Sequence, residues 1–485
     1  MKEQHQFKRS LGLWDATMLV AGSMIGSGIF IVSADMSRWV GSSGWLMFLW
    51  ILSGVITLIA ALCYGELAGM MPKAGGQFVY IQRAFGNFTS FLYGWTVFAV
   101  IQTGVIAAVA VAFAKYTAVF IPWFSPDNIL ITAGALKISA AQLLAIALIV
   151  FLTYFNSSGI RNGKIVQTIF TSAKLLALLM LIILGIYTGL HTDVFSINMT
   201  NAWDAVRLTK VDGVWVEDHI TGVALMLALG TAIIGSLFSS DAWNNVTFIA
   251  GEIKDPQRNI PKSLLLGTGI VTVLYCLANV SYLSLLPLKG SSTATDVLGQ
   301  GIQFAGGGTD RVGTAAASMI FGDVSVYIMA VLIMISTFGC NNGIILAGAR
   351  VYYAMSKEGL FFQKAGVLNK NDVPGFALWV QALWASALCL SGTYCELLNY
   401  VTFASLLFYI VTIAGIFVLR KKEPDTERPY KTVLYPFLPV LYIILASAVC
   451  AILMYTTPME TRNGLIIVFI GAPLYFLIRK KEIIS

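Results

Sequence analysis

Long apolar runs alternate with short clusters of charged residues along this chain. A helix needs roughly 20 consecutive apolar residues to cross the hydrocarbon core of a bilayer, and stretches of that order recur from end to end. Twelve of them predict membrane-spanning helices, at 16–34, 39–65, 84–114, 138–160, 165–192, 219–251, 263–288, 324–349, 373–395, 397–419, 432–459 and 463–478. The runs are continuously apolar, which favours a helical bundle over a membrane β-barrel.

The composition supports the same class of protein. Hydrophobic residues make up 57% of the 485 positions and charged residues only 11%, against about 25% charged in an ordinary soluble domain. These values exclude a soluble enzyme, a disordered chain and a nucleic-acid-binding module. We therefore expect an all-α polytopic membrane protein whose surroundings are the lipid bilayer.

The net charge of +7 is explained by where the basic residues fall. Twelve spans place both termini on one side, and if that side is the cytoplasm, the large majority of the 31 lysines and arginines lie in cytoplasmic segments. This bias follows the positive-inside rule. The sequence predicts a plasma (inner) membrane protein with cytoplasmic termini, no cleavable signal peptide and no nucleic-acid partner.

The chain offers no catalytic or metal-binding pattern. Its six cysteines form no CxxC pair, and three histidines are too few for a metal cluster. Serines are plentiful, but no nucleophile elbow occurs. We expect no metal, no cofactor and no enzymatic activity.

Two of the predicted spans contain poor helix-forming centres. The first includes AGSMIGSG (21–28), and the sixth includes GSLFSSDAWNN (235–245). Glycine in a helix interior costs about 1 kcal/mol relative to alanine, and serine and asparagine compete for backbone hydrogen bonds. Both spans are therefore expected to be discontinuous.

These breaks open two five-helix halves, 1–192 and 219–419, and two further helices lie within 432–478. Five is an odd number, so the halves would have opposite topology within a single domain. Discontinuous helices at matching positions of an inverted repeat indicate the site of a secondary transporter.

The chemistry expected at the breaks suits an α-amino acid. Backbone leaves helical pairing in a membrane only where it lines a cavity or a ligand. The freed amides of Gly26, Ser27 and Gly28 would carry positive partial charge and suit a carboxylate. The carbonyls of Gly22–Ile25 and Leu237–Ser239 would suit an ammonium group. The alternative, a small-residue helix-packing face in the first span, is made less attractive by the second break.

Two charges lie inside the spans. Lys174 follows Lys164 by ten residues, about 15 Å along a helix, which places it near the bilayer centre. We expect its ammonium near the broken first helix, where it holds that helix without a metal ion or carries a proton. Asp241 could meet the substrate ammonium, a cationic substrate side chain or Lys174, or could be a protonated structural group.

Several segments, in this order, resemble amino-acid permeases of the APC superfamily, most closely the L-type (LAT) branch. The segments are VAGSMIGSGIF (20–30), YGELAGMMPKAGGQFVYIQRAFG (64–86), IFTSAKLLAL (169–178), AWNNVTFIAGEIKDPQRNIPKSL (242–264), STFGCNNG (336–343) and LRKKEPDTERPYK (419–431). The resemblance implies a LeuT-like fold that works by alternating access.

The resemblance also implies roles for individual residues. Ser27 and Gly28 would bind the substrate carboxylate, and Lys174 would stand in place of a sodium ion, which supports exchange or proton coupling over sodium symport. The implied ammonium-binding carbonyls and other contacts belong to Met24, Ile25, Phe238, which would also cap the site, Ser239 and Ser405.

Two departures from the LAT pattern bear on substrate and partner. LAT-like members often have two small residues where this chain has Asp241 and Ala242, so its side-chain pocket is expected to differ. Loop 115–137 lacks the cysteine that animal members use to bond a heavy-chain subunit. No such subunit is expected, and a prokaryotic source fits. A polyamine or cationic amino-acid carrier, and a transporter-like receptor or sensor, are the alternatives.

Overall fold

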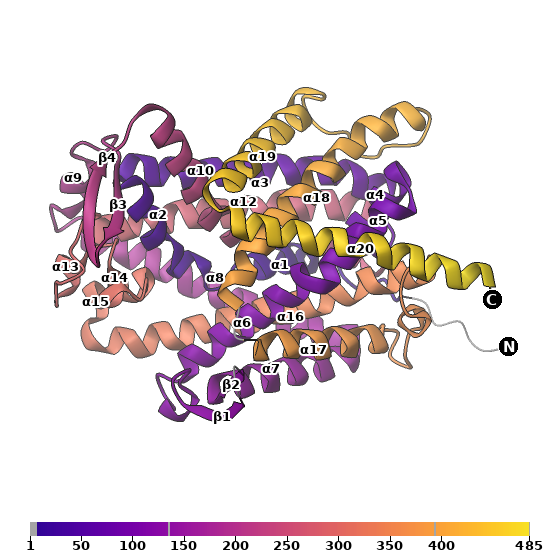
Figure 1. Cartoon of the computed structure of the whole chain (residues 1–485), viewed down its shortest axis with the longest axis horizontal. Coiled ribbons are helices and arrows are strands. Elements are labelled where there is room, and N and C mark those ends of the chain that lie inside the picture. The colour runs from indigo at the N-terminus through magenta and orange to yellow at the C-terminus, as the bar shows by residue number, and fades with distance from the viewer. Residues whose placement is uncertain (1–6, 134–135, 392–393, 485) are drawn as a thin grey trace.

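The computed structural model describes residues 7–133, 136–391 and 394–484, and Figure 1 shows a bundle built almost wholly of helices. Ten helical segments of this described part are long and apolar enough to cross a membrane. They are α3 (Ser43–Met70), the run α5–η2–α6 (Asn87–Thr117), α7 (Ala140–Ser157), α8 (Ile160–Gly189), α10 (Gly222–Ser239), α12 (Pro256–Leu285), the run α15–η5–α16 (Val312–Lys357), α18 (Tyr394–Lys422), α19 (Phe437–Thr456) and α20 (Pro458–Ile484). The chain is therefore a helical, multi-pass membrane protein.

The other two predicted spans coincide with short or divided helices. The run at 373–395 contains α17 (Gly375–Leu390), which is only 16 residues long. The run at 16–34 is divided into α1 (Leu13–Met24), the short 3₁₀ helix η1 (Gly28–Phe30) and α2 (Val32–Val40). Neither α1 nor α2 alone reaches the length that a bilayer requires.

Both expected helix breaks are present. The chain leaves helical geometry at Ile25, whose φ and ψ are −78° and 96°. In the second break, α10 ends at Ser239 and the backbone runs irregularly to α11 (Asn245–Phe248) and η4 (Ala250–Glu252). Ala242 within this stretch has a φ of +65°, a left-handed conformation that favours glycine and helps to stop the helix.

The remaining elements are two short ribbons, several short helices and the individual parts of the two composite spans. Figure 1 shows the β3–β4 ribbon and α13–α15 at one end of the molecule and α4 at the other. The two antiparallel ribbons are β1 (Ile129–Ala133) with β2 (Leu136–Ser139), and β3 (Val206–Val211) with β4 (Val214–His219). The other helices are α4 (Gln77–Phe85), α5 (Asn87–Thr96), η2 (Val97–Ile101), α6 (Gln102–Thr117), η3 (Pro122–Phe124), α9 (Val194–Met199), α13 (Val297–Gln300), α14 (Ala305–Gly308), α15 (Val312–Phe321), η5 (Gly322–Val324), α16 (Ser325–Lys357) and η6 (Gln363–Gly366).

A buried ion pair joins α16 to η4 at the end of the bundle that carries α4. Arg350 of α16 meets Glu252 of η4 at 2.9 Å, and their side chains are 1% and 2% exposed. The same η4 segment holds the start of the chain, because the Leu11 N–H donates to the Glu252 carbonyl and the Lys254 N–H donates to the Leu11 carbonyl. These bonds tie the residues that precede α1 to the segment that follows the second break.

A second set of charges ties the loop after α18 to the same end. Glu66 of α3 accepts hydrogen bonds from the Arg420 guanidinium and from the Thr432 N–H. On the surface, the hydrogen bond from Arg83 lowers the pKa of the Glu423 carboxyl. These bonds pack α3, α4 and α18 together.

Substituting one partner of the buried pair should destabilise the fold. Arg350→Met leaves Glu252 buried without a counter-charge, a change that costs about 3–5 kcal/mol in comparable cases. Thermal unfolding of the purified protein in detergent measures the loss. Arg207→Met, on the β3–β4 ribbon, is the control, and the double variant Arg350→Met/Glu252→Met should recover most of the stability. Equal melting temperatures for Arg350→Met and the control would refute the role of the pair.

Candidate functional site between two broken helices

A cavity of about 820 Å³ lies between the two helix breaks. Seven of the residues expected at the site line it: Met24, Gly26, Ser27, Gly28, Phe238, Ser239 and Asp241. The other three, Ile25, Lys174 and Ser405, lie outside its lining. The folded chain thus brings two segments more than 200 residues apart to one space.

The amides of the first break face this space without protein partners. Within the described residues, the backbone N–H groups of Gly26, Ser27 and Gly28 donate to no protein acceptor. They directly precede and begin η1, at the positive end of the second half of the broken helix. Unpaired amides in this position suit an anionic group such as a carboxylate.

Gly28 allows the two breaks to touch. A Cβ atom added at Gly28 would collide with the Ser239 hydroxyl and contact Ser239 Cβ at 3.0 Å. The missing side chain therefore sets the separation of the first break from the end of α10. Any larger residue at this position must push the two segments apart.

Lys174 stabilises the carbonyl side of the first break. Its Nζ donates to the Gly22 carbonyl at 2.5 Å, to the Ile25 carbonyl at 2.6 Å and to the Ser336 carbonyl at 3.3 Å. The side chain is buried, and its positive charge meets the negative end of α1. The Gly22 and Ile25 carbonyls, expected from the sequence to suit a substrate ammonium, instead accept from the ammonium of Lys174.

Asp241 does not pair with Lys174, although the sequence left that option open. Its Oδ1 accepts a hydrogen bond from the Tyr409 hydroxyl at 2.5 Å, whereas the three acceptors of Lys174 are backbone carbonyls. Asp241 lines the main cavity. Its carboxyl is therefore oriented by α18 and can meet a ligand there.

Ser405 lies beside Asp241 in a polar recess next to the main cavity. With Asp241 and Tyr409 it lines two small pockets of about 30 and 20 Å³, each large enough for about one water molecule. Its hydroxyl is buried and has no hydrogen-bond partner among the described residues. The expected polar contact at Ser405 is thus available, but not in the main cavity itself.

One tyrosine of α12 bridges the two breaks. The Tyr275 hydroxyl lies 3.3 Å from the Met24 carbonyl and 3.1 Å from the Ser239 carbonyl. Since a hydroxyl donates one proton, the two carbonyls share it. Tyr275 therefore couples the position of the first break to that of the second.

Sequence reasoning missed four of these polar partners, namely Tyr275, Ser336, Cys340 and Tyr409. Ser336 Oγ donates to the Ile25 and Gly26 carbonyls, and Cys340 Sγ donates to the Ser23 carbonyl. The only feature of the sequence that could have identified these four residues was a polar side-chain atom inside an otherwise apolar span. Such atoms need a partner in a membrane interior, but the partner cannot be identified without the packing.

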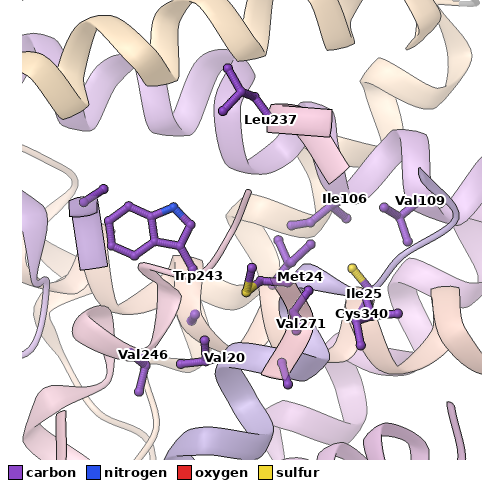
Figure 2. Close-up of a cluster of buried hydrophobic side chains, with 14 of the residues drawn as sticks. Val20, Met24, Ile25, Ile106, Val109, Leu237, Trp243, Val246, Val271 and Cys340 are labelled. Atoms are coloured by element: carbon purple, nitrogen blue, oxygen red, sulfur yellow. The ribbon is translucent and has the colours of Figure 1, made fainter. Parts of the chain in front are cut away.

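Apolar side chains hold the breaks in place. Figure 2 shows the buried cluster that includes Val20 and Met24 of α1, Trp243 and Val246 around the second break, and Val271 of α12. These residues have little or no exposed surface. These side chains thus pack closely against part of the irregular backbone of both breaks.

The cavity extends from the breaks toward the end of α6 and toward the loops that precede β1 and α15. Its lining continues from the breaks to Tyr116, to the segment 118–127 and to Thr309–Arg311. Around the second break, the Asn244 side-chain amide donates to Gln77 Oε1 at 2.9 Å, and Glu252 pairs with Arg350 at 2.9 Å.

A profile of the amino acid permease family matches residues 11–477 of the chain. The large neutral amino acids transporter small subunit 2 of rabbit (Oryctolagus cuniculus) is 30% identical over 477 residues, which cover 97% of this chain and 80% of the relative.

Two further relatives carry other names. The mouse (Mus musculus) Asc-type amino acid transporter 1 is 29% identical over 98% of this chain and 82% of its own length. The serine/threonine exchanger SteT of Bacillus subtilis is 27% identical over 99% of each chain. The likeness thus extends over nearly the whole chain, breaks included.

Removal of the Lys174 ammonium should weaken the fold around the first break. Lys174→Met leaves the buried Gly22 carbonyl without its side-chain donor, and the expected loss is about 1–3 kcal/mol. Unfolding of the purified variant in detergent measures it, with Lys210→Met on the exposed β3 strand as the matched control. If both variants unfold at the wild-type temperature, the ammonium does not stabilise the break.

Proposed function

Because the chain belongs to the amino acid permease family, we propose that it is a sodium-independent amino-acid transporter that works by exchange through alternating access. The observation that carries this proposal is the set of unpaired amides at Gly26–Gly28, which faces a cavity also lined by Asp241 and the end of α10. One end of this site suits a carboxylate and the other an ammonium group.

The ammonium group would be bound opposite the amides. Met24, Phe238 and Ser239 line the cavity, and the carbonyls of Met24 and Ser239 share only the single proton of Tyr275. Each carbonyl oxygen has two lone pairs and can accept a second donor. The aromatic ring of Phe238 would cover the bound substrate.

Independence from sodium rests on Lys174. Its ammonium already supplies a positive charge to carbonyls that would otherwise suit a metal cation. The bacterial relative is named an exchanger, which supports exchange as the transport mode. The competing mode is proton-coupled uptake, in which Lys174 would carry the proton.

The architecture proposed for this cycle has twelve crossings. Residues 1–192 and 219–419 would form two inverted five-helix halves of LeuT type, and two helices within 432–478 would follow. The breaks in α1 and α10, which open the two halves, support this arrangement. The basic loops place both termini in the cytoplasm, so the observed cavity would face outward from the plasma membrane.

Alternating access then needs two changes. The outer mouth must close over the substrate, and the inner contact of Glu252 with Arg350 must open. Because Tyr275 and Gly28 join the two breaks, a shift of one break would be transmitted to the other. No heavy-chain subunit is included in this proposal.

A second candidate is a carrier of cationic amino acids or polyamines. The observation that favours it is the carboxyl of Asp241 in the cavity lining. Inhibition of uptake by arginine, ornithine or putrescine, lost in Asp241→Asn, would support this candidate. Uptake and substrate range unchanged in Asp241→Asn would remove it.

Counter-flow in proteoliposomes tests the proposed function. We expect an internal amino acid to drive accumulation of a labelled external one from a panel of all twenty, equally with and without sodium. A requirement for an imposed pH gradient would replace exchange by proton coupling. Saturable binding without flux would indicate a receptor, and no binding or flux with any amino acid would refute the proposal.

Gly28→Ala should impair transport by separating the breaks. Its Cβ would collide with Ser239, and a displacement on the order of 1 Å at a reacting or binding site can cost up to about 100-fold in rate. We expect at least a tenfold loss of counter-flow, with partial recovery in Gly28→Ala/Ser239→Gly. Gly269→Ala in α12, where an added Cβ meets nothing within 4 Å, is the control. Normal transport by Gly28→Ala would contradict the close approach.

A further inference from the structure

We propose that Arg311, assisted by Lys115, forms an outer docking position that captures the carboxylate of an amino acid before it reaches the amides of Gly26–Gly28. This inference rests on the proposed function and adds a second binding position to the same cavity. It concerns the mouth of the cavity, which is formed by the end of α6 and by loop residues rather than by the broken helices.

Arg311 places a guanidinium at the mouth of the cavity without an ion-pair partner among the described residues. Arg311 precedes α15 and lines the cavity. Its guanidinium lies over the ring of Tyr116, 5.7 Å from the ring centroid, and makes no ion pair or side-chain hydrogen bond within residues 7–133, 136–391 and 394–484. Because this contact with the ring uses none of the N–H groups as hydrogen-bond donors to a carboxylate, they are available to bind one.

The nearest acidic neighbour in sequence is already neutralised. Asp310 accepts from both terminal nitrogens of Arg38, at 2.6 and 2.9 Å. Arg38 also donates to the Gln303 carbonyl at 2.7 Å. This clamp fixes the backbone beside Arg311 and leaves the Arg311 charge uncompensated, so the cation is held in place over the mouth.

Both signs of charge occur at the mouth. Lys115 lines the cavity on the α6 side and adds positive charge. Asp127 also lines it and accepts a hydrogen bond from the Ser125 hydroxyl at 3.2 Å. A zwitterion could therefore place its carboxylate at Arg311 and its ammonium toward Asp127.

The cavity has room for two positions. At about 30 Å³ per heavy atom, the share of a water molecule in the liquid, an amino acid of nine heavy atoms would occupy no more than about 270 Å³. The cavity volume is about 820 Å³, so a molecule at the breaks leaves the mouth unfilled. Fixed charge at such an entrance raises the local concentration of an oppositely charged group.

The test measures transport separately from each side of the membrane. The probe is the amino acid with the highest counter-flow rate, supplied to right-side-out or inside-out vesicles. Arg311→Gln should raise the outer KM about tenfold or more, the size of one charge-assisted hydrogen bond. The inner KM and the maximal rate should stay unchanged, and Arg311→Lys should recover part of the outer affinity.

Arg207→Gln is the matched control. Arg207 also lies over an aromatic ring in the outer loops, 4.5 Å from the centroid of Trp39, but does not line the cavity. The Arg207→Gln substitution removes the same charge as Arg311→Gln. An equal rise in outer KM in both variants would therefore assign the effect to long-range attraction and overturn the docking position.

The other outcomes are equally distinct. A loss on both sides, or a lower maximal rate with unchanged KM, would assign Arg311 a structural or gating role and overturn this inference alone. Absence of any amino-acid flux in the wild-type protein would overturn both this inference and the proposed function.

Discussion

The broken first helix depends on one buried ammonium group. A helix that stops in the middle of a membrane leaves carbonyls without donors, and such groups are costly where water is absent. Lys174 donates to two of them, at Gly22 and Ile25, from the neighbouring α8. Its charge also opposes the negative end of α1. The interruption can therefore persist in an apolar bundle without a bound cation.

The cavity follows from this stabilised interruption. The Gly22 and Ile25 carbonyls accept from Lys174 and the Ile25 carbonyl also accepts from the Ser336 hydroxyl, whereas the amides of Gly26–Gly28 have no acceptor among the described residues and face the cavity. Tyr275 and the missing side chain at Gly28 then join this break to the end of α10. A single polar site thus arises from two half-helices, and the buried Glu252–Arg350 pair lies just beyond the second break.

Much of the fold and part of the site could be predicted from local properties. The ten long helices coincide with predicted apolar runs, and both breaks occur where glycine, serine and asparagine gather. Seven of the ten expected site residues line one cavity. The sequence placed the Lys174 ammonium near the broken first helix, but it did not identify which carbonyls Lys174 contacts or that Ser336 shares the Ile25 carbonyl. These contacts depend on α8 and α16, which lie about 150 and 310 residues further along the chain.

The sequence by itself determined the apolar spans, their breaks and the class of chemistry at the first break, since hydropathy and helix propensity act over short stretches of chain. Only the tertiary structure decided which polar atoms remain unpaired. Lys174 takes carbonyls that a ligand could have used, Tyr409 takes one oxygen of Asp241, and Arg38 neutralises Asp310 but leaves Arg311. The physical reason is that a buried polar group is defined by its partner, and partners come together only through packing of distant segments.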